Sequence, residues 1–459
     1  MTVEVFSRKV ALPVSAEEAF AWHERPGALD RLIPPWEKVR IGSRGEGIRN
    51  GSRVVLITHQ GPLRLRWVAE HCDYQQGRQF RDIQIQGPFR HWEHTHRFIA
   101  EGKETSVLED HIEYSVRGGT LGRIVAGPFI RRKIATMFMY RHRTTVADLA
   151  AHSRHRQLGT MHVAITGSHG LIGRELTPFL TTGGHRITAL VRGEASPGQV
   201  SWDPNADSFD ASALDGVDGV VHLAGENIAA ARWTEAHKQR VLQSRVHPTR
   251  VLCEGLTRLR SPPRVLVSAS AIGLYGDRGD EILDEDSSSG NGFLARVARE
   301  WEAATEPAAA AGIRVVQVRF GVVISPKGGA LAKILTPFKM GGGGVIGSGR
   351  QHWSWISLDD AAGAIHHALL TDSVCGPVNV VAPDPVTNAT FTKTLGRVLS
   401  RPSIARVPGW AARIAFGEMA DELLLASTRV RPTRLLDSAY EFRHDSLEDA
   451  LRHVLGRAT

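Results

Sequence analysis

Cysteine is scarce in this sequence, and long apolar runs are missing from it. The three cysteines, Cys72, Cys253 and Cys375, lie far apart and form no Cys-x-x-Cys pair. This pattern excludes a disulfide framework, disfavours a zinc or thiol redox centre, and predicts a reducing, cytoplasmic location. No apolar run reaches the length of about 18 residues that a membrane-spanning helix needs. The first residues, Met1 to Val5, lack the basic and apolar regions of a signal peptide.

Positive charge is unevenly distributed along the 459 residues, a length that predicts two or three domains. The net charge is +8, and residues 1–150 hold 23 Lys and Arg against 17 Asp and Glu. A basic region can bind nucleic acid, but this one shows neither a helix-turn-helix pattern nor interleaved aromatic and basic residues. Most of its cations are arginines that alternate with apolar residues. We therefore expect a solvated sheet face and no nucleic-acid partner.

Alternating apolar and polar residues predict strands through residues 1–117, as in Leu63–Ala69 and Asp82–Gln86. One such strand carries His91, His94 and His96 in the sequence His-Trp-Glu-His-Thr-His. Because side chains alternate along a strand, His94 and His96 share a face while His91 points away. Only two ligands then converge, and structural zinc usually has four. We therefore predict no metal site and interpret these histidines as polar residues that line or cover a sheet.

Two helices are predicted around these strands. Ser15, with Glu18 three residues later, is typical of a helix start, and Pro26-Gly27 ends that helix. After Gly127-Pro128, the apolar period predicts one long amphipathic helix from about Phe129 to His152. A short helix, an antiparallel sheet and a long terminal helix together predict an α+β domain in which the sheet curls around the helix. Such a grip leaves an apolar cavity.

This N-terminal region resembles the START-like (polyketide cyclase/lipid-transport) superfamily. The resemblance rests on Ala-Phe-Ala-Trp at residues 19–22 and on Gly-Pro-Phe…Trp-x-His-x-His-x-Phe at residues 87–98, and it covers residues 1–150. It implies a helix-grip fold and a pocket for a hydrophobic ligand. We place this domain at residues 1–152. The polar, basic and patternless residues 153–160 are the predicted linker.

A dinucleotide-binding pattern begins just after the linker. The short apolar run Val163–Ile165 predicts a buried strand, followed by Thr-Gly-Ser-His-Gly-Leu-Ile-Gly at residues 166–173 and then a helical pattern. In such a turn Gly167 allows the chain to leave the strand sharply, and Gly170 lets a pyrophosphate approach the helix N-terminus, which attracts anions. Gly173 would let the helix pack closely on the sheet. Three glycines at this spacing, between a strand and a helix, predict a Rossmann-type domain.

The end of the next predicted strand indicates which dinucleotide is bound. That strand, residues 186–191, is followed by Arg192-Gly193. An acidic residue at this place would bind the ribose 2′-hydroxyl of NAD, whereas an arginine accommodates the 2′-phosphate of NADP. We therefore predict NADP as the cofactor. The alternative interpretation is a solvent-exposed arginine with no ligand.

Further strands alternate with helices and predict a doubly wound parallel sheet. One ends in the small-residue turn Leu223-Ala224-Gly225, which would lie against the adenine and ribose, and another leads into Ser268. Ligands of such sheets bind at the carboxyl ends of the strands. The predicted cofactor-binding residues are Thr166, Gly167, Ser168, Gly170, Leu171, Ile172, Gly173, Arg192, Leu223, Ala224, Gly225, Glu226 and Ser268.

Residues 161–459 together resemble the epimerase branch of the extended short-chain dehydrogenase/reductase superfamily, that is, NAD-dependent epimerase/dehydratase-like oxidoreductases. The motifs that carry the resemblance are His222–Ile228, Arg232–Thr234, Ser268–Glu281, Phe293–Arg296, Gly347–Gln351, Ser354–Ile356, Gly376–Asn379, Pro383–Asn388 and Gly417–Ala420. The resemblance implies an NADP-binding Rossmann domain, which we place at residues 161–380. It also implies a helical substrate lobe, placed at residues 381–459, and a small-molecule substrate.

The catalytic residues depart from the pattern of that superfamily. Its reductases use a Tyr with a Lys four residues later, because the Lys cation depresses the pKa of the phenol. None of the five tyrosines here has a Lys at that position. We predict that Ser270 orients the substrate and that Tyr275 donates the proton, the alternative being that Tyr275 merely packs over the cofactor. A non-catalytic NADP(H) sensor is the rival to an oxidoreductase or epimerase-like enzyme.

Overall fold

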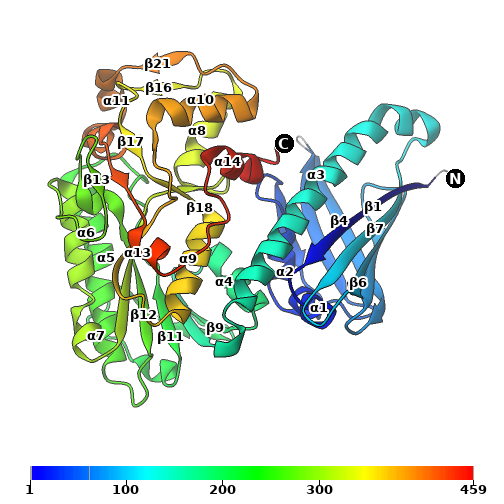
Figure 1. Ribbon diagram of the computed structural model, residues 1–459, viewed down its shortest axis with the longest axis horizontal. Helices are drawn as coiled ribbons and strands as arrows, with labels where there is room; N and C mark the ends of the chain where they lie inside the picture. Colours follow the sequence, from blue (N-terminus) through cyan, green and yellow to red (C-terminus); the bar gives the residue numbers. More distant parts are fainter. Residues whose placement is uncertain (1–2, 61–62, 458–459) are drawn as a thin grey trace. The chain divides into compact units, whose positions relative to one another are not determined.

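The computed structural model describes residues 3–60 and 63–457, so Met1 and Thr2 of the N-terminal segment considered above lie outside it. The chain forms two compact units (Figure 1). The first contains the residues up to Thr160 with two short later segments, and the second runs from Met161 to Thr177 and from His185 to Val454. Within the described residues, no helix combines the length and the apolar character needed to cross a membrane.

The first unit is built on an antiparallel sheet whose strands lie in the order β1-β7-β6-β5-β4-β3-β2. Burial alternates along both strands, between half-buried and exposed residues in β1 and between buried and half-buried residues in β7, so one face of the sheet is more closely packed than the other. The strands are β1 (Glu4–Leu12), β2 (Val39–Ser43), β3 (Arg53–Gln60), β4 (Leu63–Gln75), β5 (Gln79–Gln86), β6 (His91–Ala100) and β7 (Ser106–Ser115).

Two short helices follow β1. In α1 (Ala16–Glu24) the Ser15 hydroxyl accepts a hydrogen bond from the Glu18 amide at 3.3 Å, which confirms the predicted cap. The chain leaves the helix at Arg25, just before Pro26. A second helix, α2 (Ala28–Leu32), comes next. Phe20 and Trp22 of α1 are buried against the sheet side of the unit.

The long helix α3 (Gly119–Ser153) lies across the packed face of the sheet, which gives the helix-grip arrangement (Figure 1). It begins ten residues before Phe129, so the predicted start was wrong. Pro128 lies inside the helix rather than before it. The proline removes the hydrogen bond to the carbonyl four residues earlier, that of Ile124. Ile124 is 65% exposed, so water can satisfy that carbonyl.

The second unit contains a parallel sheet in the order β10-β9-β8-β11-β12-β14-β19. This is the doubly wound order, with its reversal between β8 and β11. The predicted α/β fold class is therefore confirmed. Helices α5 and α6 lie on one side of the sheet, and α4 and α9 on the other (Figure 1). The strands are β8 (His162–Thr166), β9 (Arg186–Val191), β10 (Gln199–Ser201), β11 (Gly219–His222), β12 (Val265–Ala271), β14 (Arg314–Phe320) and β19 (Gly376–Val380).

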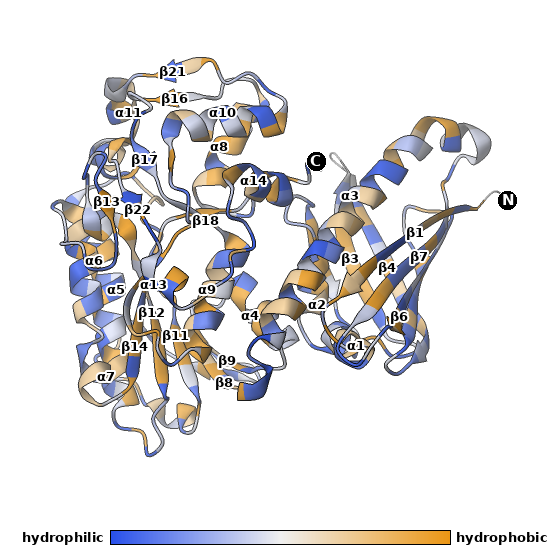
Figure 2. Cartoon of the chain, in the orientation of Figure 1, coloured by the Kyte–Doolittle hydropathy of each residue, from blue (hydrophilic) through white to orange (hydrophobic). Residues whose placement is uncertain are grey.

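Buried apolar residues fix this sheet. All four residues of β11 and six of the seven in β12 are buried. Figure 2 shows the hydrophobic colouring concentrated in these strands. Strands buried on both faces are typical of parallel sheets covered by helices. The covering helices are α4 (Gly173–Thr182), α5 (Glu235–Leu256), α6 (Phe293–Ala303), α7 (Glu306–Ala310) and α9 (Leu358–Leu370).

A smaller lobe is built from two separate stretches of chain. Strand β16 (Gly344–Ile346) pairs with β21 (Ala405–Val407), and β17 (His352–Trp353) pairs with β20 (Val386–Thr387). These pairs join residues on both sides of the boundary placed at residue 380, and they add strands to a lobe expected to be helical.

The remaining helices and strands of the chain are β13 (Ile282–Leu283), β15 (Val322–Ile324), α8 (Gly329–Lys339), β18 (Trp355–Ser357), α10 (Asn388–Leu399), α11 (Gly409–Phe416), α12 (Glu418–Ala420), β22 (Arg429–Val430), α13 (Thr433–Asp437) and α14 (Leu447–Leu455).

Candidate dinucleotide-binding site

The candidate site lies where the carboxyl ends of β8, β9, β11 and β12 meet. Strands β8 and β11 are hydrogen-bonded neighbours, with Thr166 opposite His222. The connections from these two strands run in opposite directions across the sheet, because the strand order reverses here. This switch point opens a crevice in which doubly wound proteins bind their ligands.

The glycine turn between β8 and α4 is held by close backbone contacts. Gly167 has φ +68°, and a Cβ at this position would lie 2.8 Å from the Leu223 carbonyl carbon. The turn therefore requires glycine both for its conformation and for its approach to the neighbouring turn. A Cβ on Gly173 would lie 2.3 Å from the Gly167 carbonyl oxygen. Gly173 thus lets the turn fold onto its own helix, which differs from the predicted contact with the sheet.

The residues of this turn are open to a ligand. Gly167, Ser168, Leu171 and Ile172 are half-buried, and Gly170 is exposed. The first turn of α4 follows directly, so its amide groups and the positive end of its dipole face the same opening. The backbone here can bind a phosphate, which is what the glycine spacing predicted.

Thr166 has a different place from the one predicted. Its side chain is buried, and its hydroxyl accepts hydrogen bonds from the Leu223 and Ala224 amides at 3.2 and 3.3 Å. The same hydroxyl lies 2.8 Å from His222 Nδ1. Thr166 therefore ties the glycine turn to the turn after β11, and it positions the site rather than facing a cofactor.

His222 extends this connection into the protein. Its Nε2 lies 2.9 Å from the Thr249 hydroxyl on α5. Burial lowers the pKa of His222 to about 4, so its imidazole is neutral at pH 7. A neutral imidazole carries one N–H and one acceptor nitrogen, which suits a bridge between two threonine hydroxyls.

Arg192 is exposed and follows the last residue of β9, the strand next to β8. Gly193, directly after it, has φ +85° and turns the chain away. Arg192 therefore lies at the carboxyl edge of the sheet, where the ribose of a dinucleotide binds in this fold. The residue after β9 is thus an exposed cation.

The turn after β11 is supported by Arg245, which sequence analysis missed. Arg245 donates hydrogen bonds to the Glu226 and Val241 carbonyls, both at 2.9 Å. A Cβ on Gly225 would lie 3.3 Å from its guanidinium carbon. Burial lowers the pKa of Arg245 to about 10. Gly225 thus admits a buried arginine beneath the turn.

The other residues of this turn differ in their exposure and partners. Leu223 and Ala224 are half-buried, as a contact surface for a ligand requires. The Glu226 carboxylate lies 3.5 Å from His237 Nδ1 and 3.6 Å from Arg240 Nε. The charge of Glu226 is therefore matched within the protein. The residue is half-buried in the turn, next to the candidate site.

Ser268 and Ser270 lie on β12 and face the side of α5 and α6. Ser268 is buried, and its hydroxyl has no hydrogen-bond partner among the residues that the structure describes. The Ser270 hydroxyl donates to Glu302 Oε1 at 2.6 Å. Ala271, the last residue of β12, points to the opposite side and has no hydroxyl.

The hydroxyl of Tyr275 is inside the protein. It donates to Asn379 Oδ1 at 2.8 Å and accepts from Arg319 Nη1 at 2.8 Å, and the side chain is fully buried. Burial raises the pKa of this phenol, and the nearby Arg319 only partly offsets the effect. A proton donor must reach its substrate, so this position does not support the predicted role of Tyr275.

Arg319 and Glu302 connect the two predicted catalytic residues. The guanidinium contacts both Glu302 oxygens, Nε to Oε1 and Nη2 to Oε2, each at 2.9 Å. Ser270 and Tyr275 are thus parts of one buried network, and the structure gives them a positioning role. The signal missed in the sequence was Arg319, near the end of the buried strand β14, because a buried arginine requires a carboxylate partner.

The residues present fit a dinucleotide. The glycine turn leaves no room for side chains where the backbone approaches itself, the half-buried turn after β11 offers an apolar surface, and Arg192 supplies a cation at the outer edge. The buried hydroxyl of Ser268 has no hydrogen-bond partner among the described residues, although buried polar groups usually have one. These features together form an NAD(P)-binding site.

Comparison with protein families agrees with both units. Residues 163–381 match the NAD dependent epimerase/dehydratase family, and residues 12–139 match the family described as polyketide cyclase / dehydrase and lipid transport. Residues 407–454 match a domain family of unknown function. The first two matches confirm the resemblances inferred from the sequence.

Individual relatives show how far the similarity extends. An epimerase family protein of Mycobacterium bovis is 44% identical over 64% of this chain and 98% of its own length. The structure of a nucleoside-diphosphate sugar epimerase from Corynebacterium glutamicum covers 98% of this chain and 90% of its own, with 35% identity and a TM-score of 0.81. The human epimerase family protein SDR39U1, solved with NADPH, covers 65% of this chain and 100% of its own, with 35% identity and a TM-score of 0.60.

Proposed function

Because this chain belongs to the NAD dependent epimerase/dehydratase family, we propose that it is an NADP-dependent oxidoreductase or epimerase-like enzyme acting on a small molecule. The observation that carries the choice of NADP is Arg192, an exposed cation at the end of β9. A guanidinium binds a phosphate through paired, charge-assisted hydrogen bonds. The human relative crystallised with NADPH supports the same choice.

The protein's part in the reaction is to bind and orient. The turn at residues 166–173 would hold the pyrophosphate, and the turn at residues 223–226 would border the adenosine. When bound, the cofactor supplies hydride chemistry. The Arg319–Glu302 pair keeps the loop that carries Tyr275 fixed at the end of β12. A rigid support of this kind holds a substrate in a defined position.

A second candidate is a protein that binds NADP(H) without turning it over. The observation that favours it is the inward position of the Ser270 and Tyr275 hydroxyls, both of which already have protein partners. In that case the cofactor would act as the signal, and the N-terminal unit would respond to its binding. Measurement of hydride transfer separates the two functions.

The N-terminal unit is proposed to bind an apolar molecule. Trp67 and Trp92 lie with ring centroids 5.1 Å apart between the sheet and α3. Both indole N–H groups are buried and lack a hydrogen-bond partner among the described residues. Half-buried Phe89 and Met137 pack against the same cluster. A ligand with an apolar body and one polar acceptor would match this environment.

Titration of the purified chain with NADPH and with NADH tests the proposal. We expect NADPH to bind more tightly, as followed by cofactor fluorescence, and to be oxidised with a member of a carbonyl panel. Tight NADPH binding without turnover across the panel would favour the binding protein. A preference for NADH would contradict the role of Arg192, and failure to bind either would contradict the proposed site.

A further inference from the structure

A cluster of histidines and aspartates lies on the packed face of the N-terminal sheet. Strand pairing places His71, Asp82 and His94 side by side on β4, β5 and β6, and places His96 opposite Asp110 on β7. Helix α3 adds a sixth side chain, that of His142, to the five on these strands. Between 2% and 9% of each residue is exposed, except for Asp82, whose side chain is 18% exposed.

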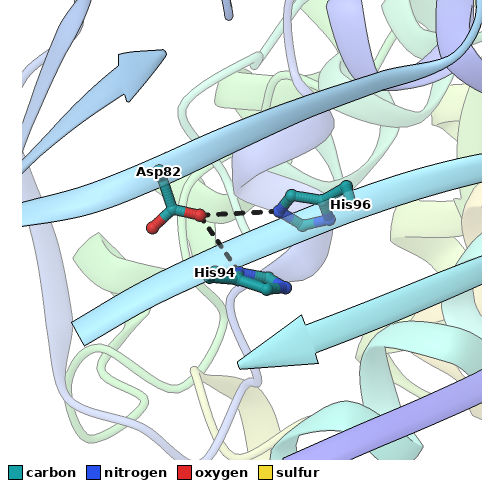
Figure 3. Close-up of side chains that lie close together, drawn as sticks. All are labelled: Asp82, His94 and His96. Carbon is teal, nitrogen blue, oxygen red and sulfur yellow. Dashed lines mark ion pairs between the residues drawn. The ribbon is translucent and has the colours of Figure 1, made fainter. Parts of the chain in front are cut away.

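Three atoms of this cluster converge on one point. Asp82 Oδ2 lies 3.1 Å from His94 Nδ1 and 3.6 Å from His96 Nε2 (Figure 3). All three atoms lie within 4.8 Å of one another. Ligands bound to zinc at about 2.0–2.2 Å with tetrahedral angles are themselves about 3.3–3.6 Å apart. The distances from Asp82 Oδ2 to the two nitrogens are close to this range, and the two nitrogens lie within 4.8 Å of each other, so the three atoms can surround one metal ion.

The opposite nitrogens of the two imidazoles meet a second carboxylate. His94 Nε2 and His96 Nδ1 each lie 2.8 Å from Asp110 Oδ1. His142 Nε2 lies 2.5 Å from the other oxygen of Asp110. A metal-binding histidine usually gives its second N–H to a carboxylate, which fixes its tautomer and its orientation. Asp110 provides this support to His94, whose Nε2 is hydrogen-bonded to it, whereas His96 Nδ1 is close to the same oxygen without hydrogen-bond geometry.

Two carboxylates lie among the four imidazoles of this cluster. Among the described residues, the ion-pair partners of Asp82 and Asp110 are all histidines. The Arg141 guanidinium also interacts electrostatically with both carboxylates. Imidazole nitrogens and carboxylate oxygens together are the donor set that a divalent transition-metal ion binds.

A second group in the chain, Asp359, His444 and His453, is less suited to a metal. The Asp359 carboxylate lies 3.7 Å from an Arg443 nitrogen, and His444 Nδ1 lies 2.6 Å from Asp449. An arginine already supplies the positive charge there. This group serves as an internal comparison for the first.

We propose that Asp82, His94 and His96 bind one divalent transition-metal ion, with Asp110 orienting His94. Two histidines and one carboxylate bind zinc or iron(II) and leave coordination positions free for water or another ligand. The sequence predicted that His94 and His96 share one face of the strand and that His91 lies on the other. This geometry agrees with that prediction, because the His91 side chain is 33% exposed and lies beside Glu93. The third ligand, Asp82, comes from the neighbouring strand β5, and the alternation of side chains along β6 alone does not reveal it.

Metal binding to the full chain tests the proposal directly. The protein is stripped with a chelator, dialysed and equilibrated with Zn²⁺, and bound zinc is measured by mass spectrometry and calorimetry. We expect one equivalent in the wild type and none in Asp82→Asn or His94→Gln. The Asp110→Asn change should weaken binding about 10–100-fold, as loss of such supporting groups typically does.

Matched variants and a crystal give the decisive comparisons. His91→Gln, on the same strand but the other face, and His453→Gln, in the second group, should retain one equivalent. An anomalous diffraction peak between Asp82, His94 and His96 in zinc-soaked wild-type crystals would support the site even if a variant fails to fold. No binding by the wild type, retained binding in both Asp82→Asn and His94→Gln, or loss only in His453→Gln would overturn the proposal.

Discussion

Both units of the chain bury histidines, but the side chains around those histidines differ in charge. In the second unit, His222 lies between the hydroxyls of Thr166 and Thr249, and burial lowers its pKa to about 4. In the first unit, His94 is equally buried but lies between Asp82 and Asp110, and its pKa is raised to about 9. Burial alone would keep both imidazoles neutral. The neighbouring polar group, rather than the depth of burial, therefore decides whether a buried histidine is charged.

This contrast separates two kinds of polar interior. His222 is bonded to two threonine hydroxyls and connects the turns of the dinucleotide site through neutral hydrogen bonds. It therefore needs no counter-charge. The cluster around Asp110 contains ionised groups that stabilise the fold only while every partner is present. We therefore expect the unit containing His222 to lose less stability than the unit containing Asp110 when one polar partner is removed.

The largest expected effect is that of Asp110→Asn in the metal-free protein. Asp110 contacts His94, His96 and His142, and the amide would remove one of the two carboxylates that stabilise protonated His94. Removing one partner of a buried ion pair typically costs about 3–5 kcal/mol. We expect this loss to appear in hydrogen exchange as lower protection of β6, β7 and α3, with the parallel sheet unchanged.

Thr249→Val is the matched change in the other unit. The Thr249 hydroxyl is bonded to His222, accepts from the Trp301 indole N–H and donates to the Arg245 carbonyl. The change removes these three neutral hydrogen bonds and should cost about 2–3 kcal/mol, at about 1 kcal/mol for each. If both variants lost the same amount of protection in their own units, the distinction between charged and neutral clusters would be wrong.

Arg192→Ala tests the charge at the exposed edge of the dinucleotide site. A hydrogen bond to a charged group contributes about 1.5–3 kcal/mol, so NADPH affinity should fall roughly 10–150-fold. NADH has no 2′-phosphate, and its affinity should stay the same. Fluorescence titration of both cofactors measures the effect, and an equal loss for the two would show that Arg192 supports the fold of the turn instead.

Acid should weaken the second unit through His222. Its pKa is about 4 in the folded chain and about 6.5 when unfolded, so its contribution is complete above pH 6.5 and is lost as the pH falls. Between pH 7 and pH 5 the free energy of unfolding should drop by about 2 kcal/mol from this residue. Comparing wild type with His222→Gln by urea denaturation isolates the effect. A parallel pH dependence in the two proteins would argue against a neutral, buried His222.

Sequence and structure agree best where the information is local. The turn at residues 166–173, the strand before it and the helix after it were predicted, because three glycines and a buried run within a dozen residues determine them. The Ser15 cap was found for the same reason. The start of α3 was missed, because Pro128 normally ends a helix and its tolerance depends on water reaching the Ile124 carbonyl.

The rest of the candidate site depends on contacts between distant positions. Arg319 lies 17 residues from Glu302 and 44 from Tyr275, and only the parallel pairing of β12 with β14 brings them together. In the same way Asp82 and Asp110 reach His94 through strand register. Without the register, the sequence shows isolated polar residues, so Ser270 and Tyr275 were interpreted as catalytic when their hydroxyls face inward.

The smallest expected effect is that of Tyr275→Phe. The change removes two hydrogen bonds, but Arg319 keeps Glu302 and Asn379 keeps its bond to the Arg431 carbonyl. Because each former partner retains another, the free energy of unfolding should fall by only about 1 kcal/mol, and NADPH affinity should not change. If an activity is found in the carbonyl panel, a positioning role predicts that kcat falls modestly and that its pH profile is preserved. Abolished turnover with unchanged stability would instead show that the phenol reaches the substrate, and that the inward network opens during catalysis.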